Sequence, residues 1–501
     1  MSHTFITTTI PYVNAAPHLG FALEAVQADV LTRHARHVGS ETRLLSGTDD
    51  NSLKNVIAAE AAGVDVQSFV DANAAHFEAL ASALSLNYDD FIRTSTDPRH
   101  RVGVDALWHA CADDLYQGHY EGLYCVGCEH YLTPDELDAH GHCPEHAAPP
   151  QRISEHNWFF RLSRYTEPIR DAIVSGRLRI EPPSRRNEVL GFLAGGLRDF
   201  SVSRTAERAR GWGIPVPGDD SQVIYVWFDA LGNYVNSLGY GNDDQRELAR
   251  WWTDADRRIH VVGKGVLRFH AVYWPAILLA AGLELPTDIL VHDYLTVDGH
   301  KISKSAPGTA ISPLDLVETY GVDAVRWWLL RDVPRVGDAD FTRARLETRT
   351  QEDLVGGFGN VVNRVVTMVH RFAGGVVSEG RADDDAKALR WACDSAPDLI
   401  ATALATADFR PATSALLAIV DEANRYIEAT KPWTLAKAGE RERLDTVLGN
   451  LLASCVTIAS ELAPFLPDAA ARIAAACTPV DGLLPVPVKV FGSLGKVAGI
   501  S

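Results

Sequence analysis

The feature that most constrains the fold is an apolar run at residues 5–10 that leads into a turn and then into a helical pattern. The turn contains Pro17, His18 and Gly20. After it, apolar residues recur at helical spacing, at Leu19, Leu23, Val26 and Val30. This order predicts a strand, a turn and a helix N-terminus, where unpaired backbone amides attract anions and His18 adds a donor. A histidine and a glycine after a strand are common in ordinary turns, but together these features favour a cradle for nucleotide phosphates.

A second segment suited to phosphate stands far along the chain, at residues 298–305. It reads Asp-Gly-His-Lys-Ile-Ser-Lys-Ser, so Lys301, Ser303 and Lys304 share a short loop with a glycine. Lysines are compact charges on flexible stems, which suits them to a leaving pyrophosphate. A lysine pair in a loop is usually only solvated surface. Its combination with the His18 turn favours a loop that closes over a triphosphate.

The composition sets limits on the class of protein. With 501 residues, 46% hydrophobic and 22% charged, the chain is large enough for about two to four domains. No apolar run approaches the roughly 20 residues of a membrane span, and the N-terminus lacks a secretory signal, so we expect a cytoplasmic protein. Seven cysteines, an odd number, indicate reduced thiols. A net charge of -18 argues against nonspecific coating of nucleic acid but leaves specific RNA recognition open.

The first part of the chain, residues 1–115, alternates apolar strands with helical patterns. This is the βαβ pattern of a doubly wound parallel sheet, where ligands bind at the carboxyl ends of strands. A strand expected at residues 42–46 runs into Gly-Thr-Asp49-Asp50. A carboxylate at this place is well positioned to meet an ammonium group. The alternative is that Asp49 caps the helix expected to begin near Ser52.

Two pairs of metal-binding residue types follow. Cys125 and Cys128 are separated by two residues, and Cys143 and His146 repeat that spacing. Paired ligand turns of this kind predict a closed tetrahedral zinc site, which has no open position and is therefore structural. The competing fourth ligands are His130, His140 and His142. The alternative is two incidental reduced pairs.

The later nucleotide-fold segments and the helical region carry further candidates. Trp227, Ala230, Leu231 and Tyr234 share one face if they are helical, although a core stripe is the commoner reason for such spacing.

An apolar stripe is expected at Phe358, Val361, Val362, Val365 and Val369. Asn360 and Arg364 point away from that stripe, and with Trp433 they are suited to hydrogen-bond and stack unpaired bases. The alternative is a solvated helix face beside a half-buried tryptophan.

Taken together, these motifs resemble those of a known family. The two phosphate segments resemble the paired class I aminoacyl-tRNA synthetase signatures, His-Ile-Gly-His and Lys-Met-Ser-Lys-Ser, which read His-Leu-Gly-Phe and Lys-Ile-Ser-Lys-Ser here. Within that class the chain is similar to methionyl-tRNA synthetases over nearly its whole length. The resemblance implies an α/β fold: a Rossmann-type catalytic domain with a zinc-binding insertion, then an all-α anticodon-binding bundle. The implied regions are 1–115 and 221–295 for the catalytic halves, 116–220 for the insertion, 296–350 for the signature loop and 351–501 for the bundle and tail.

The resemblance also assigns roles to matching residues. Those implied to bind ATP are Pro17, His18, Gly20, Phe21, Gly263, Lys264, Lys301, Ser303 and Lys304, of which His18, Lys301 and Lys304 are catalytic. Those implied to bind methionine are Ile10, Tyr12, Asp49, Trp227, Ala230, Tyr234 and His292, with Asp49 on the α-amino group. The implied zinc ligands are Cys125, Cys128, Cys143 and His146. The implied readers of the anticodon are Asn360, Arg364 and Trp433.

The implied reaction joins methionine to ATP, with Mg²⁺, as methionyl-adenylate and then transfers it to tRNA(Met) with a CAU anticodon. A monomer is expected, because no dimerisation module follows the bundle. Four departures from the family pattern, Phe21, Asn51, Gly265 and Asp293, suggest slower or retuned activity. If the lost donor at residue 21 matters, Phe21→His raises activity. The other hypotheses are a class I enzyme for another amino acid and a synthetase-like RNA-binding protein without catalysis.

Overall fold

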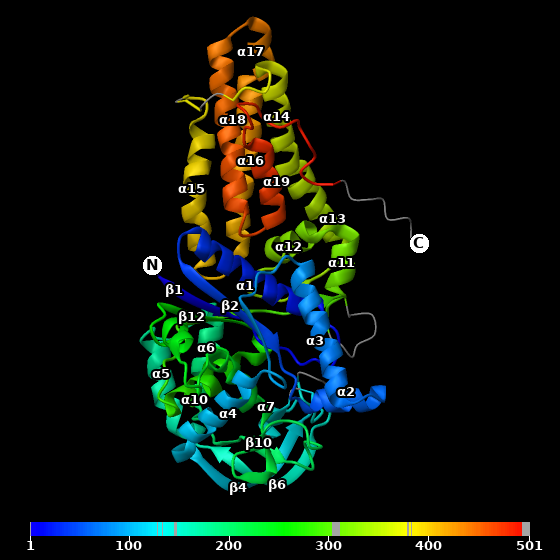
Figure 1. The fold of residues 1–501 in the computed structure, drawn as a ribbon, viewed down its shortest axis with the longest axis vertical. Coiled ribbons are helices and arrows are strands. Elements are labelled where there is room, and N and C mark those ends of the chain that lie inside the picture. Colours follow the sequence, from blue (N-terminus) through cyan, green and yellow to red (C-terminus); the bar gives the residue numbers. More distant parts are fainter. Residues whose placement is uncertain are drawn as a thin grey trace. The chain divides into compact units, whose positions relative to one another are not determined.

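The computed structural model describes residues 2–127, 129–132, 134–144, 148–302, 311–377, 380–381 and 383–492 (Figure 1). The chain divides into two compact units. The first comprises Met1–Ala28, Val38–Ala81 and Asn87–Asp293, and the second comprises Asp29–His37, Ser82–Leu86 and Tyr294–Ser501. In the part of the chain that is described, no helix is both long and apolar enough to cross a membrane.

The first unit is built on a six-stranded parallel sheet. Its strands lie in the order β3 (Asp90–Arg93), β2 (Glu41–Thr48), β1 (His3–Thr7), β12 (Arg257–Gly263), β13 (Asp288–His292) and β7 (Arg179–Glu181). The strand order reverses between β1 and β12, the kind of switch point where doubly wound folds bind ligands beyond the carboxyl ends of strands. The predicted doubly wound parallel sheet is confirmed. Strand β7 forms its edge beside β13, although the sequence placed this segment in the insertion.

Strand β1 is shorter than the apolar run that predicted it. It ends at Thr7 because the Thr9 amide donates to Glu24 Oε1 at 2.7 Å and not to a neighbouring strand. Ile10 therefore lies beyond the strand, in the segment that leads to the switch point.

Helices pack on this sheet and complete its core. One buried cluster joins Phe5 and Ile289 of the sheet to Leu107 of α4 and Ile277 of α10. The helices wholly or mainly in the first unit are α1 (Leu19–His37), α2 (Leu53–Ala62), α3 (Val66–Ala83), α4 (Pro98–Ala110), α5 (Thr166–Val174), α6 (Pro183–Ala194), α7 (Val226–Leu231), α8 (Asn233–Asn236), α9 (Arg246–Leu248) and α10 (Trp274–Ala280).

An antiparallel sheet interrupts the parallel one. Its order is β5 (His130–Leu132), β4 (Leu115–Cys125), β6 (Gln151–Phe160) and β8 (Phe200–Ser201). The long strands β4 and β6 stay in register from Leu115 opposite Phe160 to Tyr124 opposite Gln151. A smaller sheet of β10 (Pro215–Val216), β11 (Asp219–Ile224) and β9 (Ser203–Thr205) then leads the chain back to α7.

The second unit is mainly helical. Its small sheet contains β15 (His300–Lys301), β14 (Leu295–Val297) and β16 (Ala339–Asp340). Its helices are α11 (Pro313–Tyr320), α12 (Val322–Arg331), α13 (Arg343–Arg349), α14 (Asn360–Ala373), α15 (Lys387–Leu404), α16 (Phe409–Thr430), α17 (Pro432–Ala438), α18 (Arg441–Leu462) and α19 (Pro467–Cys477), the longest of which are seen in Figure 1. The apolar stripe predicted for α14 is buried as expected.

Candidate active site

The turn after β1 presents His18 at the N-terminus of α1. His18 Nδ1 accepts a hydrogen bond from the Gly20 amide at 3.1 Å, so the neutral imidazole carries its proton on Nε2. A Cβ on Gly20 would lie 2.9 Å from the His18 ring, which explains the need for glycine there. An N–H donor thus stands beside the amides of a helix N-terminus, a combination that suits an anion.

Glu24 links three elements at the same end of the sheet. Its carboxylate accepts the Thr9 amide at 2.7 Å and lies 2.9 Å from His292 Nε2, at the end of β13. The Nδ1 atom of His292 lies 2.9 Å from the backbone oxygen of Asp293, so both ring nitrogens face acceptors. Burial lowers the pKa of His292, but Glu24 and then Asp293 outweigh it and the net pKa is raised. Gly263 permits close approach, since a Cβ there would lie 3.4 Å from the His292 ring.

Asp49 lies where β2 ends. It forms an isolated parallel bridge with Tyr12, which joins the end of β2 to the segment after β1. The cap of α2 is Ser52, whose hydroxyl accepts the Lys54 amide, so the interpretation of Asp49 as the helix cap is wrong. Asp49 is 2% exposed and accepts the Asn51 amide at 3.2 Å.

Asp49 belongs to a cluster of four buried acidic side chains, only three of which have a basic partner among the described residues. The other three members each face a basic side chain: Asp50 faces Arg93 at 2.8 Å, Glu129 faces Arg204 at 3.0 Å, and Asp229 faces His100. Within the described residues, Asp49 forms no ion pair. Burial first, and then Asp229, Glu129 and Asp50, raise the pKa of Asp49 well above its ordinary value. A ligand's ammonium group would supply the missing charge.

Aromatic side chains form a wall near Asp49. The ring of Tyr12 meets Trp227 edge-on, with centroids 6.3 Å apart. Phe269 stacks on the Trp227 ring, with the two centroids 3.7 Å apart. Trp227 Nε1 is buried and has no acceptor among the described residues. An unsatisfied buried donor costs about 1–3 kcal/mol, so a ligand acceptor here would be stabilised. Ile10 packs against the same core cluster.

Tyr234 continues this wall from α8. Its hydroxyl lies 2.7 Å from His270 Nε2, while His270 Nδ1 lies 2.9 Å from the Val266 carbonyl oxygen. Because the carbonyl can only accept, Nδ1 carries the proton and the Tyr234 hydroxyl donates to Nε2. Burial lowers the pKa of His270 to about 4 and keeps it neutral. Trp227, Ala230 and Leu231 lie in α7 and Tyr234 lies in α8, so the helical conformation expected of these four residues is confirmed.

Two of the departures from the family pattern have structural partners. Asn51 Nδ2 donates to Asp229 at 2.7 Å, so this residue ties the acid cluster together. Asp293 is buried and pairs with Arg185 of α6. Gly265 is exposed in a short turn, Lys264–Val266.

The fourth departure, Phe21, faces the core. Its ring is 8% exposed and meets Phe77 of α3 edge-on, with centroids 5.1 Å apart. The prediction that Phe21→His raises activity assumed a side chain that faces the nucleotide. The structure instead gives residue 21 a packing role, and only its backbone belongs to the phosphate turn.

The predicted zinc site lies partly outside the described residues, as Cys128 and His146 do. Cys125 at the end of β4 and Cys143 are both buried, and they share one small cluster with Leu132. The structure therefore brings the first ligand of each predicted pair together.

The predicted loop and anticodon residues lie in the second unit. Ser303 and Lys304, and the side chain of Lys301, fall outside the described part of the chain. Asn360 is exposed at the start of α14. Arg364 donates to Asn424 at 3.2 Å and pairs with Glu428 at 2.9 Å. Trp433 is 42% exposed in α17, an exposure that fits both a base-stacking residue and the alternative of a half-buried tryptophan.

Several residues of the site were missed by sequence reasoning. They are Glu24, His100, Glu129, Asp229 and Phe269. An acid inside an otherwise apolar helical face is a usable signal for Glu24. Nothing in the sequence brings Glu129, Asp229 and His100 together, because they come from separate segments that meet only in the fold.

Comparison with known proteins agrees with this geometry. Residues 4–153 and 146–366 match the family model described as tRNA synthetases class I (M), and residues 378–491 match that of the anticodon binding domain of methionyl tRNA ligase. The methionine–tRNA ligase of Thermotoga maritima is 38% identical over 475 residues, which are 94% of this chain and 74% of that protein. The methionine–tRNA ligase of a Synechocystis species is 37% identical over 93% of this chain and 88% of its own length.

Solved structures show the same similarity. Mycobacterium tuberculosis methionyl-tRNA synthetase in complex with methionyl-adenylate superposes with a TM-score of 0.92 at 34% identity, covering 98% of this chain and 100% of that one. The free-state structure from the same organism gives a TM-score of 0.84 at 31% identity and covers 98% of each chain. The chain therefore belongs to the methionyl branch of the class I aminoacyl-tRNA synthetases, the methionine–tRNA ligases.

Proposed function

We propose that this enzyme activates methionine with ATP and charges tRNA, with Asp49 as the residue that receives the α-ammonium group. The observation that supports this proposal is that Asp49 has no positively charged partner among the described residues. Three acids around it are paired, and Asp49 alone in that cluster lacks a basic partner within the described residues. An uncompensated buried carboxylate is costly, and it gains most from a ligand that brings its own positive charge.

The methionine side chain would lie among Ile10, Tyr12, Trp227, Ala230, Tyr234 and His292. Ring edges pack favourably on a thioether sulfur. The Tyr234 hydroxyl already donates its hydrogen bond to His270. The methionine sulfur would therefore pack against the Tyr234 ring and would not accept a hydrogen bond from its hydroxyl. The unsatisfied Trp227 N–H offers a donor to an oxygen of the substrate.

ATP would bind at the switch point between β1 and β12. The contacts would come from Pro17, His18, Gly20, the Phe21 backbone, Gly263 and Lys264, with Lys301, Ser303 and Lys304 closing over the triphosphate and Mg²⁺ accompanying the substrate. The carboxylate of methionine attacks the α-phosphate and pyrophosphate leaves. Such a transfer needs reactants held in line and donors placed where charge develops. The His18 Nε2 proton at the α1 N-terminus serves this purpose.

A structural zinc ion would be held by Cys125, Cys128, Cys143 and His146. The burial of Cys125 and Cys143 in one cluster, with thiolate and imidazole as the donor types, fits a closed tetrahedral site. Bound zinc would tie the end of β4 to the loop before β6.

The tRNA would be read at its CAU anticodon by Asn360, Arg364 and Trp433 of the second unit. The anticodon-domain match begins at residue 378, so it includes Trp433, while Asn360 and Arg364 precede it on α14. A monomer in the cytoplasm stays a prediction, which light scattering and cell fractionation would test.

Amino-acid-dependent ATP–pyrophosphate exchange, run with all twenty amino acids, tests this function. Methionine alone should support exchange. Exchange only with another amino acid would indicate a retuned ligase, and exchange with none would indicate an RNA-binding protein without catalysis.

A further inference from the structure

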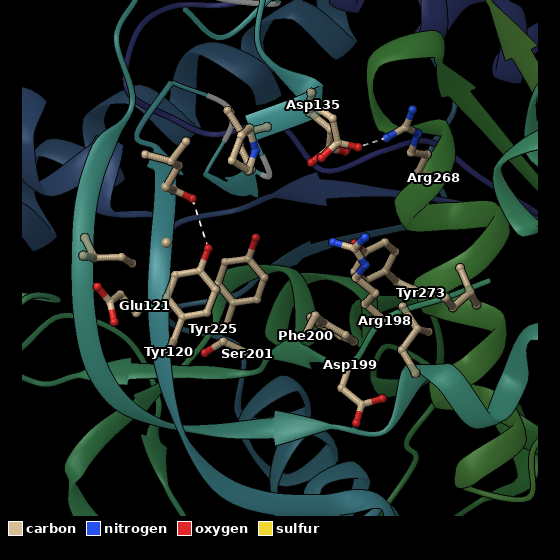
Figure 2. A pocket seen from close by; sticks show the side chains of 18 of the residues that line it. Tyr120, Glu121, Asp135, Arg198, Asp199, Phe200, Ser201, Tyr225, Arg268 and Tyr273 are labelled. Carbon is tan, nitrogen blue, oxygen red and sulfur yellow. Dashed lines mark hydrogen bonds and ion pairs between the residues drawn. The ribbon is translucent and has the colours of Figure 1, made fainter. Parts of the chain in front are cut away.

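A cavity of about 970 Å³ lies in the first unit, beside the antiparallel sheet that contains β4 and β6 (Figure 2). Its charged lining residues are four carboxylates and three arginines: Glu121, Asp135, Glu136, Asp199, Arg152, Arg198 and Arg268. These charges nearly balance, so the cavity favours a ligand of neither sign. The second unit contains a more selective arrangement, an ion pair that joins α14 to α16.

Two side chains of α16 hold Arg364 of α14. The Arg364 Nη1 atom donates to Asn424 Oδ1 at 3.2 Å, and Nη2 donates to Glu428 Oε1 at 2.9 Å. Asn424 and Glu428 are four residues apart and therefore lie on the same face of their helix. The two hydrogen bonds engage two of the five N–H donors of the guanidinium group. Donors remain for a further partner.

The acid of this pair is open to solvent. The side chain of Glu428 is 64% exposed and that of Arg364 is 33% exposed. Exposed ion pairs contribute little to stability, so stability does not account for an acid at this place. An exposed carboxylate also repels the phosphates of RNA, and the chain already has a net charge of -18. Glu428 therefore favours RNA binding only where a base donates a hydrogen bond to it.

The pair lies close in the chain to Trp433, the proposed stacking residue. Helix α16 ends at Thr430 and α17 begins at Pro432, so only Lys431 separates the two helices. The backbone of Lys431 lies in the left-handed region, with φ of 45°, which makes this junction a sharp turn. Glu428 belongs to the last turn of α16 and Trp433 to the first turn of α17. One helix junction thus supplies both an aromatic face and a hydrogen-bond acceptor.

The Arg364–Glu428 pair matches the hydrogen-bonding pattern of an unpaired cytosine. An unpaired base is read on the edge that it would use in a base pair. On that edge cytosine offers the N4 amino group as a donor and the N3 and O2 atoms as acceptors. A glutamate accepts from N4, and an arginine donates to the two acceptors. Uracil has an oxygen in place of the amino group, and this oxygen would face the carboxylate.

We propose that Glu428 selects the cytosine of the anticodon over uracil, together with Arg364. Asn424 is a positioning residue that holds the arginine beside the acid. Glu428 supplies the acceptor that the other proposed readers lack, since Arg364 and the Trp433 indole N–H only donate. The inference rests on the proposed function, because it concerns how the CAU anticodon is read.

The test measures charging and binding of two tRNA transcripts that differ only in having a CAU or a UAU anticodon. Wild type is compared with Glu428→Gln, because glutamine keeps the shape of the side chain and can turn either a carbonyl or an N–H toward the base. Glu422→Gln is the matched control, since Glu422 pairs with Arg425 at 2.6 Å on the same helix. Pyrophosphate exchange without tRNA and thermal melting are measured for all three proteins.

Wild type should prefer the CAU transcript in both kcat/KM and binding. In Glu428→Gln this preference should fall roughly tenfold or more, because the UAU transcript gains, while exchange and melting temperature stay unchanged. The control should keep the preference of wild type.

An unchanged preference in Glu428→Gln would overturn the inference. So would an equal loss with both transcripts, which would mean that Glu428 only supports Arg364. Absence of methionine-dependent exchange in wild type would defeat the proposed function alone, since the binding comparison still decides the role of Glu428.

Discussion

Replacing Asp49 by asparagine should lower activity and raise stability at the same time. The substitution keeps the size of the side chain and removes the charge that has no partner in the acid cluster. A substrate ammonium that enters this buried site would then lack its counter-ion. Loss of one partner of a buried ion pair costs about 3–5 kcal/mol. We therefore expect kcat/KM for methionine in pyrophosphate exchange to fall by about two hundred- to five thousandfold.

The gain in stability has a defined dependence on pH. The pKa of Asp49 is raised in the folded enzyme, whereas in the unfolded chain it has its ordinary value of about 3.9. As pH rises above about 4, the unfolded state gives up this proton first, so wild type loses stability that the variant keeps. Asp49→Asn should therefore raise the free energy of unfolding at pH 7, and the difference should vanish near pH 3.5. Denaturant melts at both pH values measure this.

Asp90→Asn is the matched control in the same sheet. Asp90 pairs with Arg99 at 2.8 Å and with Arg43 at 3.0 Å, and although burial raises its pKa, these two partners outweigh burial and hold the pKa below its ordinary value. This variant should lose stability at pH 7. If Asp49→Asn also lost stability, or kept its exchange activity within about threefold of wild type, the assignment of Asp49 as an uncompensated charge would be refuted.

Three further predictions concern other parts of the enzyme. Glu24→Gln should reduce the free energy of unfolding by about 1.5–3 kcal/mol at pH 6. The reduction should be smaller at pH 10. Glu24 raises the pKa of His292, so the histidine is protonated and paired with Glu24 at low pH, and this pairing is lost as the pH rises through that pKa. Phe21→His should not raise exchange and should lower stability by about 1–3 kcal/mol, because the ring packs on Phe77. Cys143→Ser should release bound zinc, measured by metal analysis, and lower the melting temperature with little change in KM for methionine.

Each of these has an outcome that would contradict it. A Glu24→Gln defect that grows with pH would mean that His292 is neutral in the folded state. Faster exchange in Phe21→His would place that side chain at the nucleotide. Unchanged zinc content in Cys143→Ser would remove this residue from the metal site, for which Cys125→Ser is the matched comparison.

The sequence predicted local features better than the contacts between them. The alternation of apolar strands and helices was enough for the parallel sheet, and the periodicity around Val361 and Val365 was enough for the buried face of α14. Strand β7 could not be assigned, because a segment of Arg179–Glu181 has too few residues to show a pattern.

The candidate site was predicted where a motif stands in one continuous segment. The His18 turn and the Asp49 strand end are of this kind. The departure at residue 21 was misjudged, because sequence does not show that the first turn of α1 directs Phe21 towards Phe77. The acid cluster was missed for a similar reason: its charges are unremarkable until burial brings Glu129 and Asp229 beside Asp49.

The most direct test of the central claim measures which part of the substrate Asp49 recognises. Calorimetry would compare methionine, methioninol and 4-(methylthio)butanoate as ligands of the wild-type enzyme. Methioninol keeps the ammonium group and should bind, whereas the butanoate keeps the thioether and carboxylate but lacks the amine and should bind at least about a hundredfold more weakly than methionine. Binding of the butanoate as tight as that of methionine would contradict the account.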